Sequence, residues 1–287
     1  MNPFEYLEPA NVNEALSMLD QWKGDAKIIA GGTDLIPLMR DKIVVPKCVI
    51  DISRLSELAF IKKTEDGIHI GALTQLRTIE TSPTIKQNAP VLAEATEQVG
   101  SIQVRNVGTI GGSLVNASPA ADVAPPLLVC EGKVKARSIR GEREILLSEF
   151  FVGVKKCVLG ADELLTEIVV PKMLPQTGES FLKVGKRNAL IISIASAAAS
   201  IALNETMHSK VRVALGSVAP TPVRALKIEA FLEGTNITEK SIDEASQIVA
   251  SDISPISDLR ASAEYRKEIS CILVRRVLQR AFEMAKK

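Results

Sequence analysis

The sequence predicts an α+β fold of three consecutive units, two small α/β subdomains followed by a C-terminal α+β domain. The chain has 287 residues, more than one hydrophobic core usually holds, so several units are expected. Strand and helix patterns are mixed along the first 175 residues, whereas in the remainder three strand patterns precede three helical ones. We therefore expect units at residues 1–53, 54–175 and 176–287.

The first unit is predicted to be a small α/β subdomain. Apolar residues at helical spacing predict a helix over Asn13–Trp22, which Gly24 ends, and Lys27–Ala30 follows as a strand. A short helix over Leu35–Met39 and a buried strand over Cys48–Asp51 complete the unit.

In the second unit strand patterns dominate. Alternating residues predict strands at Ala59–Lys62, Gly67–Gly71 and Lys133–Arg137. Helices are expected at Thr74–Glu80, with Thr74 as N-cap, and at Pro90–Val99. The stretch from Ile102 to Ala124 is rich in Gly, Ser, Asn and Pro and shows no periodicity, which favours a segment wrapped around a ligand.

The third unit is predicted to be a three-stranded antiparallel sheet with helices on one face. Its strands are expected at Ser180–Val184, Ile191–Leu203 and Lys210–Val218. Its helices are expected at Val223–Leu232, Glu239–Ala250 and Ala261–Ala285.

Composition excludes several classes of function. A net charge of +1 without charge blocks argues against nucleic acid or anionic lipid as a partner. The four scattered cysteines and the lack of a leader or membrane-span pattern predict a cytoplasmic, reduced protein. The two histidines, His69 and His208, are too few for a multi-histidine metal site, and His69 sits in an alternating strand that favours a structural role.

Two glycine-centred segments carry the functional signal: Ala30-Gly-Gly-Thr-Asp34 and Thr109-Ile-Gly-Gly-Ser113. Consecutive glycines let backbone amides converge on an anion, because no Cβ blocks the approach. The chain has neither a Walker lysine loop nor a Rossmann glycine fingerprint. Two such segments predict a double grip on a diphosphate, which points to a flavin nucleotide.

Ordered motifs extend this pattern into a family resemblance. The first glycine segment, Ala30–Asp34, is followed by Val104–Gly112, which overlaps the second segment, and then by Asn116-Ala-Ser-Pro-Ala-Ala-Asp122. Together with Ala219–Arg224 and the helix from Tyr265, they resemble the FAD-binding medium subunit of the molybdenum hydroxylases. That family includes the aerobic-type carbon monoxide dehydrogenase medium subunit and the FAD domain of xanthine dehydrogenase. The resemblance implies a vanillyl-alcohol-oxidase-type (PCMH-type) fold with non-covalent FAD between its subdomains.

The resemblance also implies which residues contact FAD. The first segment and its flanks would hold the diphosphate and adjoining parts through backbone amides and the Thr33 hydroxyl: Ile28, Ile29, Ala30, Gly31, Gly32, Thr33, Asp34 and Leu35. The second segment would supply further amides: Thr109, Ile110, Gly111, Gly112 and Ser113. Asp122 would accept hydrogen bonds from FAD hydroxyls, Val99 and Leu165 would form apolar walls, and Lys183 would be a cation near the flavin.

Each of these positions also has a plainer interpretation. The first segment is alternatively an ordinary strand–turn–helix corner, and Asp122 a local contact in a Pro-Ala-rich turn. Val99 and Leu165 are alternatively core residues, and Lys183 a solvated strand lysine. Ser113 departs from the asparagine common in the family, so one side-chain contact differs. Arg105 and Asn106 belong to the motif and could serve only to brace the loop.

The expected function is that of an electron-transfer subunit, part of an FAD-dependent oxidoreductase, with no catalytic or metal-binding residue of its own. The resemblance implies a small iron–sulfur subunit with two-iron two-sulfur clusters and a large molybdopterin subunit as partners, in a dimer of heterotrimers. Electrons would pass from the clusters to FAD and on to NAD, a quinone or oxygen. The alternatives are a stand-alone flavin-dependent oxidoreductase and a scaffold that has lost its cofactor.

Overall fold

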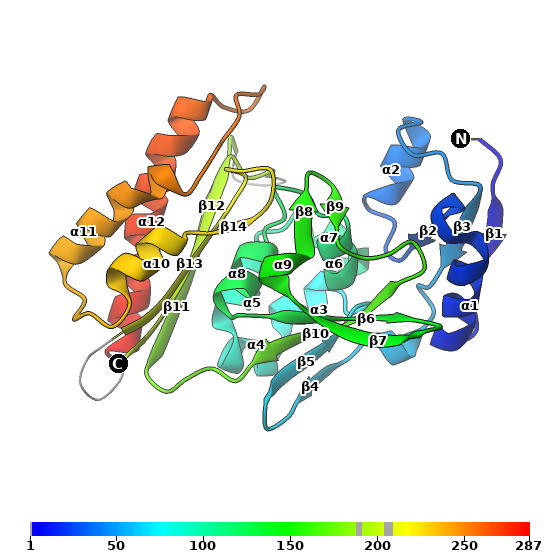
Figure 1. Cartoon of the computed structure of the whole chain (residues 1–287), viewed down its shortest axis with the longest axis horizontal. Helices are drawn as coiled ribbons and strands as arrows, with labels where there is room; N and C mark the ends of the chain where they lie inside the picture. Colours follow the sequence, from blue (N-terminus) through cyan, green and yellow to red (C-terminus); the bar gives the residue numbers. More distant parts are fainter. Residues whose placement is uncertain (1, 188–190, 204–208) are drawn as a thin grey trace.

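Three sheets follow one another along the molecule, with the N-terminus at one end and the C-terminal helices at the other (Figure 1). The computed structural model describes residues 2–187, 191–203 and 209–287. The predicted fold class is confirmed: two α/β parts are followed by an antiparallel sheet covered by helices. None of the helices in the described residues combines the length and apolar character needed to cross a bilayer.

The first sheet is parallel, with strand order β1-β3-β2. Its strands are β1 (Glu5–Leu7), β2 (Ala26–Ile29) and β3 (Cys48–Asp51). Helix α1 (Val12–Trp22) begins after Asn11, whose side chain accepts the Glu14 amide at 3.0 Å, and buries one apolar face on the sheet. The short helix α2 (Leu35–Arg40) follows the first glycine segment, as expected.

The second sheet has strand order β4-β5-β10-β6-β7 and is antiparallel. Its strands are β4 (Ile61–Lys63), β5 (Gly67–Gly71), β6 (Lys133–Ser138), β7 (Gly141–Leu146) and β10 (Leu164–Pro171). A hairpin of β8 (Phe151–Gly153) and β9 (Lys156–Cys157) projects beside it. The helices of this part are short: α3 (Leu76–Thr81), α4 (Pro83–Asn88), α5 (Pro90–Glu97), α6 (Ile102–Val107), α7 (Ile110–Val115), α8 (Ala124–Val129) and α9 (Leu147–Phe150).

The segment 102–124 shows no periodicity in the sequence, yet it contains α6 and α7 and runs up to α8. One expectation for this part is wrong. Thr74 does not cap α3: Gln75 occupies the N-cap position, and the Thr74 hydroxyl instead donates to the Phe60 carbonyl at 2.9 Å. The hydroxyl of a threonine that precedes a helix can form a hydrogen bond either with the helix or with a neighbouring loop. Here it bonds to the neighbouring loop.

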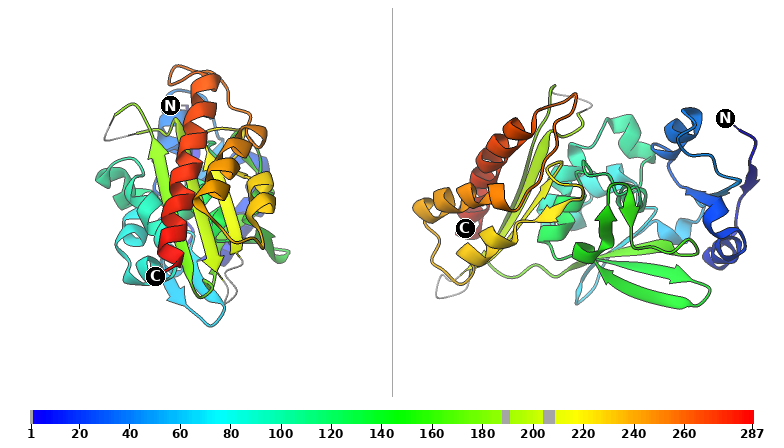
Figure 2. Two further views of the ribbon diagram at one scale, coloured as in Figure 1. Left: turned by 90° about the vertical axis from the view of Figure 1, so that its left-hand side faces the viewer. Right: turned by 45° about the horizontal axis from the view of Figure 1, so that its top comes forward.

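The third sheet is antiparallel, with strand order β11-β12-β13-β14. Its strands are β11 (Thr177–Val184), β12 (Ala195–Leu203), β13 (Ser209–Gly216) and β14 (Val223–Arg224). Helices α10 (Leu226–Leu232), α11 (Glu239–Ile248) and α12 (Ala263–Ala285) lie on one face, with α12 running along β11 and β12 (Figure 2). Residues 223–224, expected in a helix, form the short fourth strand instead, and β12 begins later than expected.

The other face of this sheet packs on α5 and α8 of the central part, and Glu179 of β11 is buried in that interface. One Glu179 oxygen accepts the Val91 amide at 3.3 Å and the other accepts the Cys130 thiol at 3.4 Å. Burial raises the pKa of Glu179 to about 7. The side chain is therefore a neutral acid over much of the range in which an exposed glutamate is charged.

Replacing Glu179 with Gln is expected to remove a pH dependence of stability. The folded chain keeps its Glu179 proton up to about pH 7, whereas the unfolded chain loses it near 4.5. Stability from this group is thus complete below pH 4.5 and declines as the pH rises to 7, by roughly 3 kcal/mol. Urea unfolding at pH 5 and pH 8 should show Glu179→Gln more stable than wild type only at pH 8. Glu65→Gln, at an exposed position, is the control; equal pH dependence in all three proteins would contradict the assignment.

Candidate functional site

The first glycine segment offers a row of unpaired backbone amides. The chain leaves β2 at Ile29, turns through Gly31 and Gly32, and enters α2 at Leu35. Gly32 has a φ of +68°, which glycine adopts without strain. None of the amides from Gly31 to Leu35 donates to another residue that the structure describes, and neither does the Thr33 hydroxyl. Half-buried amides without protein partners are suited to an anion.

The second glycine segment is built differently, because it forms helix α7. The side chain of Thr109 caps this helix by accepting the Gly112 amide at 3.1 Å. The amides of Ile110 and Gly111 donate to the carbonyls of Thr74 and Ala72, and that of Ser113 donates to Thr109. A Cβ on Gly111 would lie 2.7 Å from the Ala72 carbonyl oxygen. The glycine here serves close packing, and of these five amides only that of Thr109 lacks an acceptor among the described residues.

The structure nevertheless brings the two segments together. A Cβ on Gly31 would overlap the Val107 carbonyl, and a Cβ on Gly108 would lie 3.6 Å from the Thr33 hydroxyl. Asp34 accepts a hydrogen bond from the Asn116 amide group at 2.8 Å, and Asn116 in turn accepts one from Lys155 at 2.8 Å. The turn that carries the free amides of the first segment therefore lies against Val107 and Gly108, directly before the second segment, and is tied to Asn116 directly after it.

Arg105 braces the chain directly before the second segment, in agreement with the plainer interpretation of that residue. It is buried, pairs with Glu80 at 2.7 Å and donates to the Val99 carbonyl at 2.9 Å. Val99 is partly buried against the central core, whereas Leu165 on β10 lies fully within it. Ile28 and Ile29 are half-buried at the end of β2. These placements suit apolar support behind the segments.

Asp122 and Lys183, expected as two separate contacts, form a buried ion pair with each other at 2.7 Å. Asp122 also accepts a hydrogen bond from Ser193 at 2.5 Å. Burial raises the pKa of Asp122, while Lys183 and Ser193 act in the opposite direction. Lys183 is 3% exposed, so it is not a solvated strand lysine. Ser193 carried no sequence signal, since its partner lies 71 residues away.

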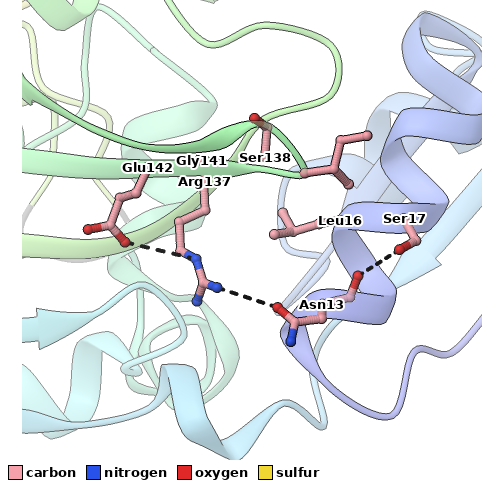
Figure 3. A pocket seen from close by; sticks show the side chains of 8 residues that line it. Asn13, Leu16, Ser17, Arg137, Ser138, Gly141 and Glu142 are labelled. Carbon is pink, nitrogen blue, oxygen red and sulfur yellow. Dashed lines mark hydrogen bonds and ion pairs between the residues drawn. The ribbon is translucent and has the colours of Figure 1, made fainter.

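Other candidate features lie elsewhere. A cavity of about 620 Å³ lies between α1 and the β6–β7 hairpin, lined by residues such as Asn13 and Arg137 and by none of the expected site residues (Figure 3). The Nδ1 atom of His69 lies 2.5 Å from Glu167, and its Nε2 atom lies 3.2 Å from Asp66. Although burial opposes it, these carboxylates raise the pKa of His69, which fits a structural role. His208 lies outside the described residues, and within them no cluster of metal-ligating side chains occurs.

Comparison with known proteins assigns the chain's relatives. Residues 2–173 match the model for the FAD binding domain in molybdopterin dehydrogenase, and residues 180–281 match the CO dehydrogenase flavoprotein C-terminal domain. The 6-hydroxypseudooxynicotine dehydrogenase complex subunit alpha of Paenarthrobacter nicotinovorans is 34% identical over 99% of this chain and 96% of that protein. The carbon monoxide dehydrogenase medium chain of Hydrogenophaga pseudoflava is 31% identical over 97% of both. A solved carbon monoxide dehydrogenase structure from the same organism matches with a TM-score of 0.94 at 33% identity, over 99% of both chains.

Replacing Gly31 with Ala is expected to separate the two segments. The added Cβ meets the backbone of Val107 and Gly108, which cannot move aside as a side chain would. A backbone displacement of this kind should cost about 1–3 kcal/mol of unfolding free energy. Gly24→Ala is a matched control in the same unit, because nothing lies within 4 Å of its Cβ position. Urea unfolding of both variants tests this, and equal stability would show that the close approach at Gly31 is absent.

Proposed function

The chain belongs to the FAD-binding medium subunits of molybdenum hydroxylase-type complexes, and we propose that it holds FAD against the Gly31–Leu35 amides and transfers electrons to an external acceptor. The observation that carries the proposal is the run of five backbone amides, Gly31 to Leu35, that have no acceptor among the described residues, in a turn that contacts Val107 and Gly108. A diphosphate has oxygens to accept several such donors at once, and charge-assisted hydrogen bonds of this kind are strong.

The described residues fit the cofactor. The amides of Gly31 to Leu35, the Thr33 hydroxyl and the Thr109 amide are donors without protein acceptors, while glycines at 31 and 108 keep the facing surfaces free of side chains. The other residues proposed for the cofactor site are the ones expected from the sequence: Ile28, Ile29, Ala30, Val99, Ile110, Gly111, Gly112, Ser113, Asp122, Leu165 and Lys183. Among these, Gly111 and Leu165 act from behind the site, through packing.

The chemistry that bound FAD supplies is electron transfer, which we propose runs from the iron–sulfur clusters of a partner subunit to NAD, a quinone or oxygen. The residues of this chain bind and orient the cofactor and exclude water from its diphosphate. We find no pairing of described residues that acts as a general acid or base on a substrate. The proposed units remain 1–53, 54–175 and 176–287, supported by one sheet within each.

The partners proposed are a small iron–sulfur subunit and a large molybdopterin subunit, arranged as a dimer of heterotrimers in the cytoplasm. The comparisons that support this are with subunits named alpha, medium chain or FAD-subunit, which are names given to parts of larger complexes. The chain spans nearly the whole length of each of these relatives, so it corresponds to one such part.

The purified full chain is expected to bind FAD non-covalently at one site. Acid denaturation should release all flavin into the supernatant, because no covalent anchor is involved. Thr33→Val, which removes a donor but keeps the shape, should weaken FAD binding about tenfold, measured by fluorescence titration. Thr235→Val, with a hydroxyl in the C-terminal domain that donates to Leu232, is the control. Failure of the wild-type chain to bind FAD, alone or with its partners, would overturn the proposal.

Affinity purification of the chain from its native cell is expected to recover an iron–sulfur protein and a larger molybdenum protein in equal amounts. The isolated chain should not reduce an artificial acceptor with small organic substrates, because the substrate would be oxidised on a partner. Steady turnover by the chain alone would instead support the stand-alone oxidoreductase. Recovery of the complex without flavin would support the scaffold.

A further inference from the structure

The ammonium of Lys183 is fully engaged by protein acceptors. It donates to Asp122 at 2.7 Å, to the Gln98 carbonyl at 2.5 Å and to the Ile191 carbonyl at 3.5 Å. An ammonium has three protons, so these contacts use all of its donors. Direct hydrogen bonding of Lys183 to a flavin would require breaking one of them.

Asp122, in contrast, keeps capacity to accept. One of its oxygens accepts from Lys183 and the other from Ser193. An ionised carboxylate has about four lone-pair positions, so about two remain for other donors. Asp122 lies in the turn between α7 and α8, and this turn begins with Asn116, whose side chain donates to Asp34 of the first glycine segment.

Both partners of Asp122 come from the C-terminal domain. Lys183 lies near the end of β11, and Ser193 precedes β12. The same turn is fixed to that domain by the Ser217 amide, which donates to the Pro119 carbonyl at 2.7 Å. A buried ion pair is seldom more stabilising than well-packed apolar residues of similar volume, so its presence favours a role beyond stability.

We propose that Lys183 and Ser193 are positioning residues of the C-terminal domain, which orient Asp122 so that it accepts hydrogen bonds from the hydroxyl groups of FAD. Lys183 acts through Asp122 rather than on the flavin ring. This inference rests on the proposed function and assigns the two residues of the C-terminal domain a part in the cofactor site.

The experiment is an FAD titration of the flavin-free full chain carrying Ser193→Ala. Removing the hydroxyl is expected to weaken FAD binding about tenfold, because Asp122 loses one of the two bonds that fix it. Ser180→Ala is the matched control: Ser180 is equally buried on β11, but its hydroxyl has no partner among the described residues. The thermal unfolding of each flavin-free protein is measured alongside, so that a loss of folding is separated from a loss of affinity.

A double-mutant cycle separates action through Asp122 from direct action on the flavin. Lys183→Met should weaken FAD binding in the wild-type background but not further in an Asp122→Ala background. An equal loss in both backgrounds would overturn the assignment for Lys183. FAD affinity of Ser193→Ala equal to that of Ser180→Ala would overturn the assignment for Ser193. Absence of FAD binding by the wild-type chain would instead reject the proposed function itself.

Discussion

The contact on which the candidate site depends is the approach of Gly31 to the backbone at Val107. Any larger residue at 31 would place its Cβ inside the Val107 carbonyl, so the turn after β2 can touch the second segment only through glycine. The contact adds to an apolar junction in which Leu73 and Leu164 of the second unit pack into the core of the first. A second contact restrains the amides of residues 31–35, because Asp34 accepts a hydrogen bond from Asn116, which itself accepts one from Lys155. The absence of a Cβ at Gly31 thus permits the contact that helps to place the donor amides of residues 31–35.

The two glycine pairs look equivalent in the sequence and are not equivalent in the structure. The first pair leaves its amides free, whereas those of Gly111 and Gly112 are satisfied within the protein. The difference arises from Ala72 and Thr74, whose carbonyls extend toward α7 from almost 40 residues upstream. Sequence spacing indicates that a segment can form an anion cradle, but the pairing of each amide is a tertiary property. The sequence predicts that both segments supply amides to the diphosphate, whereas in the second segment only the Thr109 amide lacks an acceptor among the described residues.

Most elements with a clear period were predictable, and the exceptions share physical causes. α1, α12 and the strands around them have long apolar patterns, and they occur close to the expected positions. The helices α4, α6, α7 and α8 have only six residues each, too few to show a period, and they persist through packing against one another and the sheet. Residues 223–224 join β13 because that sheet edge supplies backbone partners, which no local propensity reveals. The family resemblance predicted Asp122 and Lys183 as site residues, but neither motif nor pattern revealed that these residues pair or that Ser193 joins them.

The C-terminal domain contacts the rest of the chain through directional polar groups as well as through apolar packing. Glu94 of α5 accepts the Phe181 amide at 2.9 Å and pairs with Arg280 of α12 at 2.7 Å. The Glu179 side chain accepts hydrogen bonds from the Val91 amide and the Cys130 thiol. The Lys183 ammonium donates to the Gln98 carbonyl and to Asp122. Apolar contacts tolerate sliding, whereas buried hydrogen bonds are satisfied in one arrangement and costly in any other. The domain is therefore held in one orientation, and the turn carrying Asp122, which lies between it and the glycine segments, inherits that orientation. A domain whose sequence carries no glycine segment of its own thus supplies both side chains that bind Asp122, a residue of the candidate site.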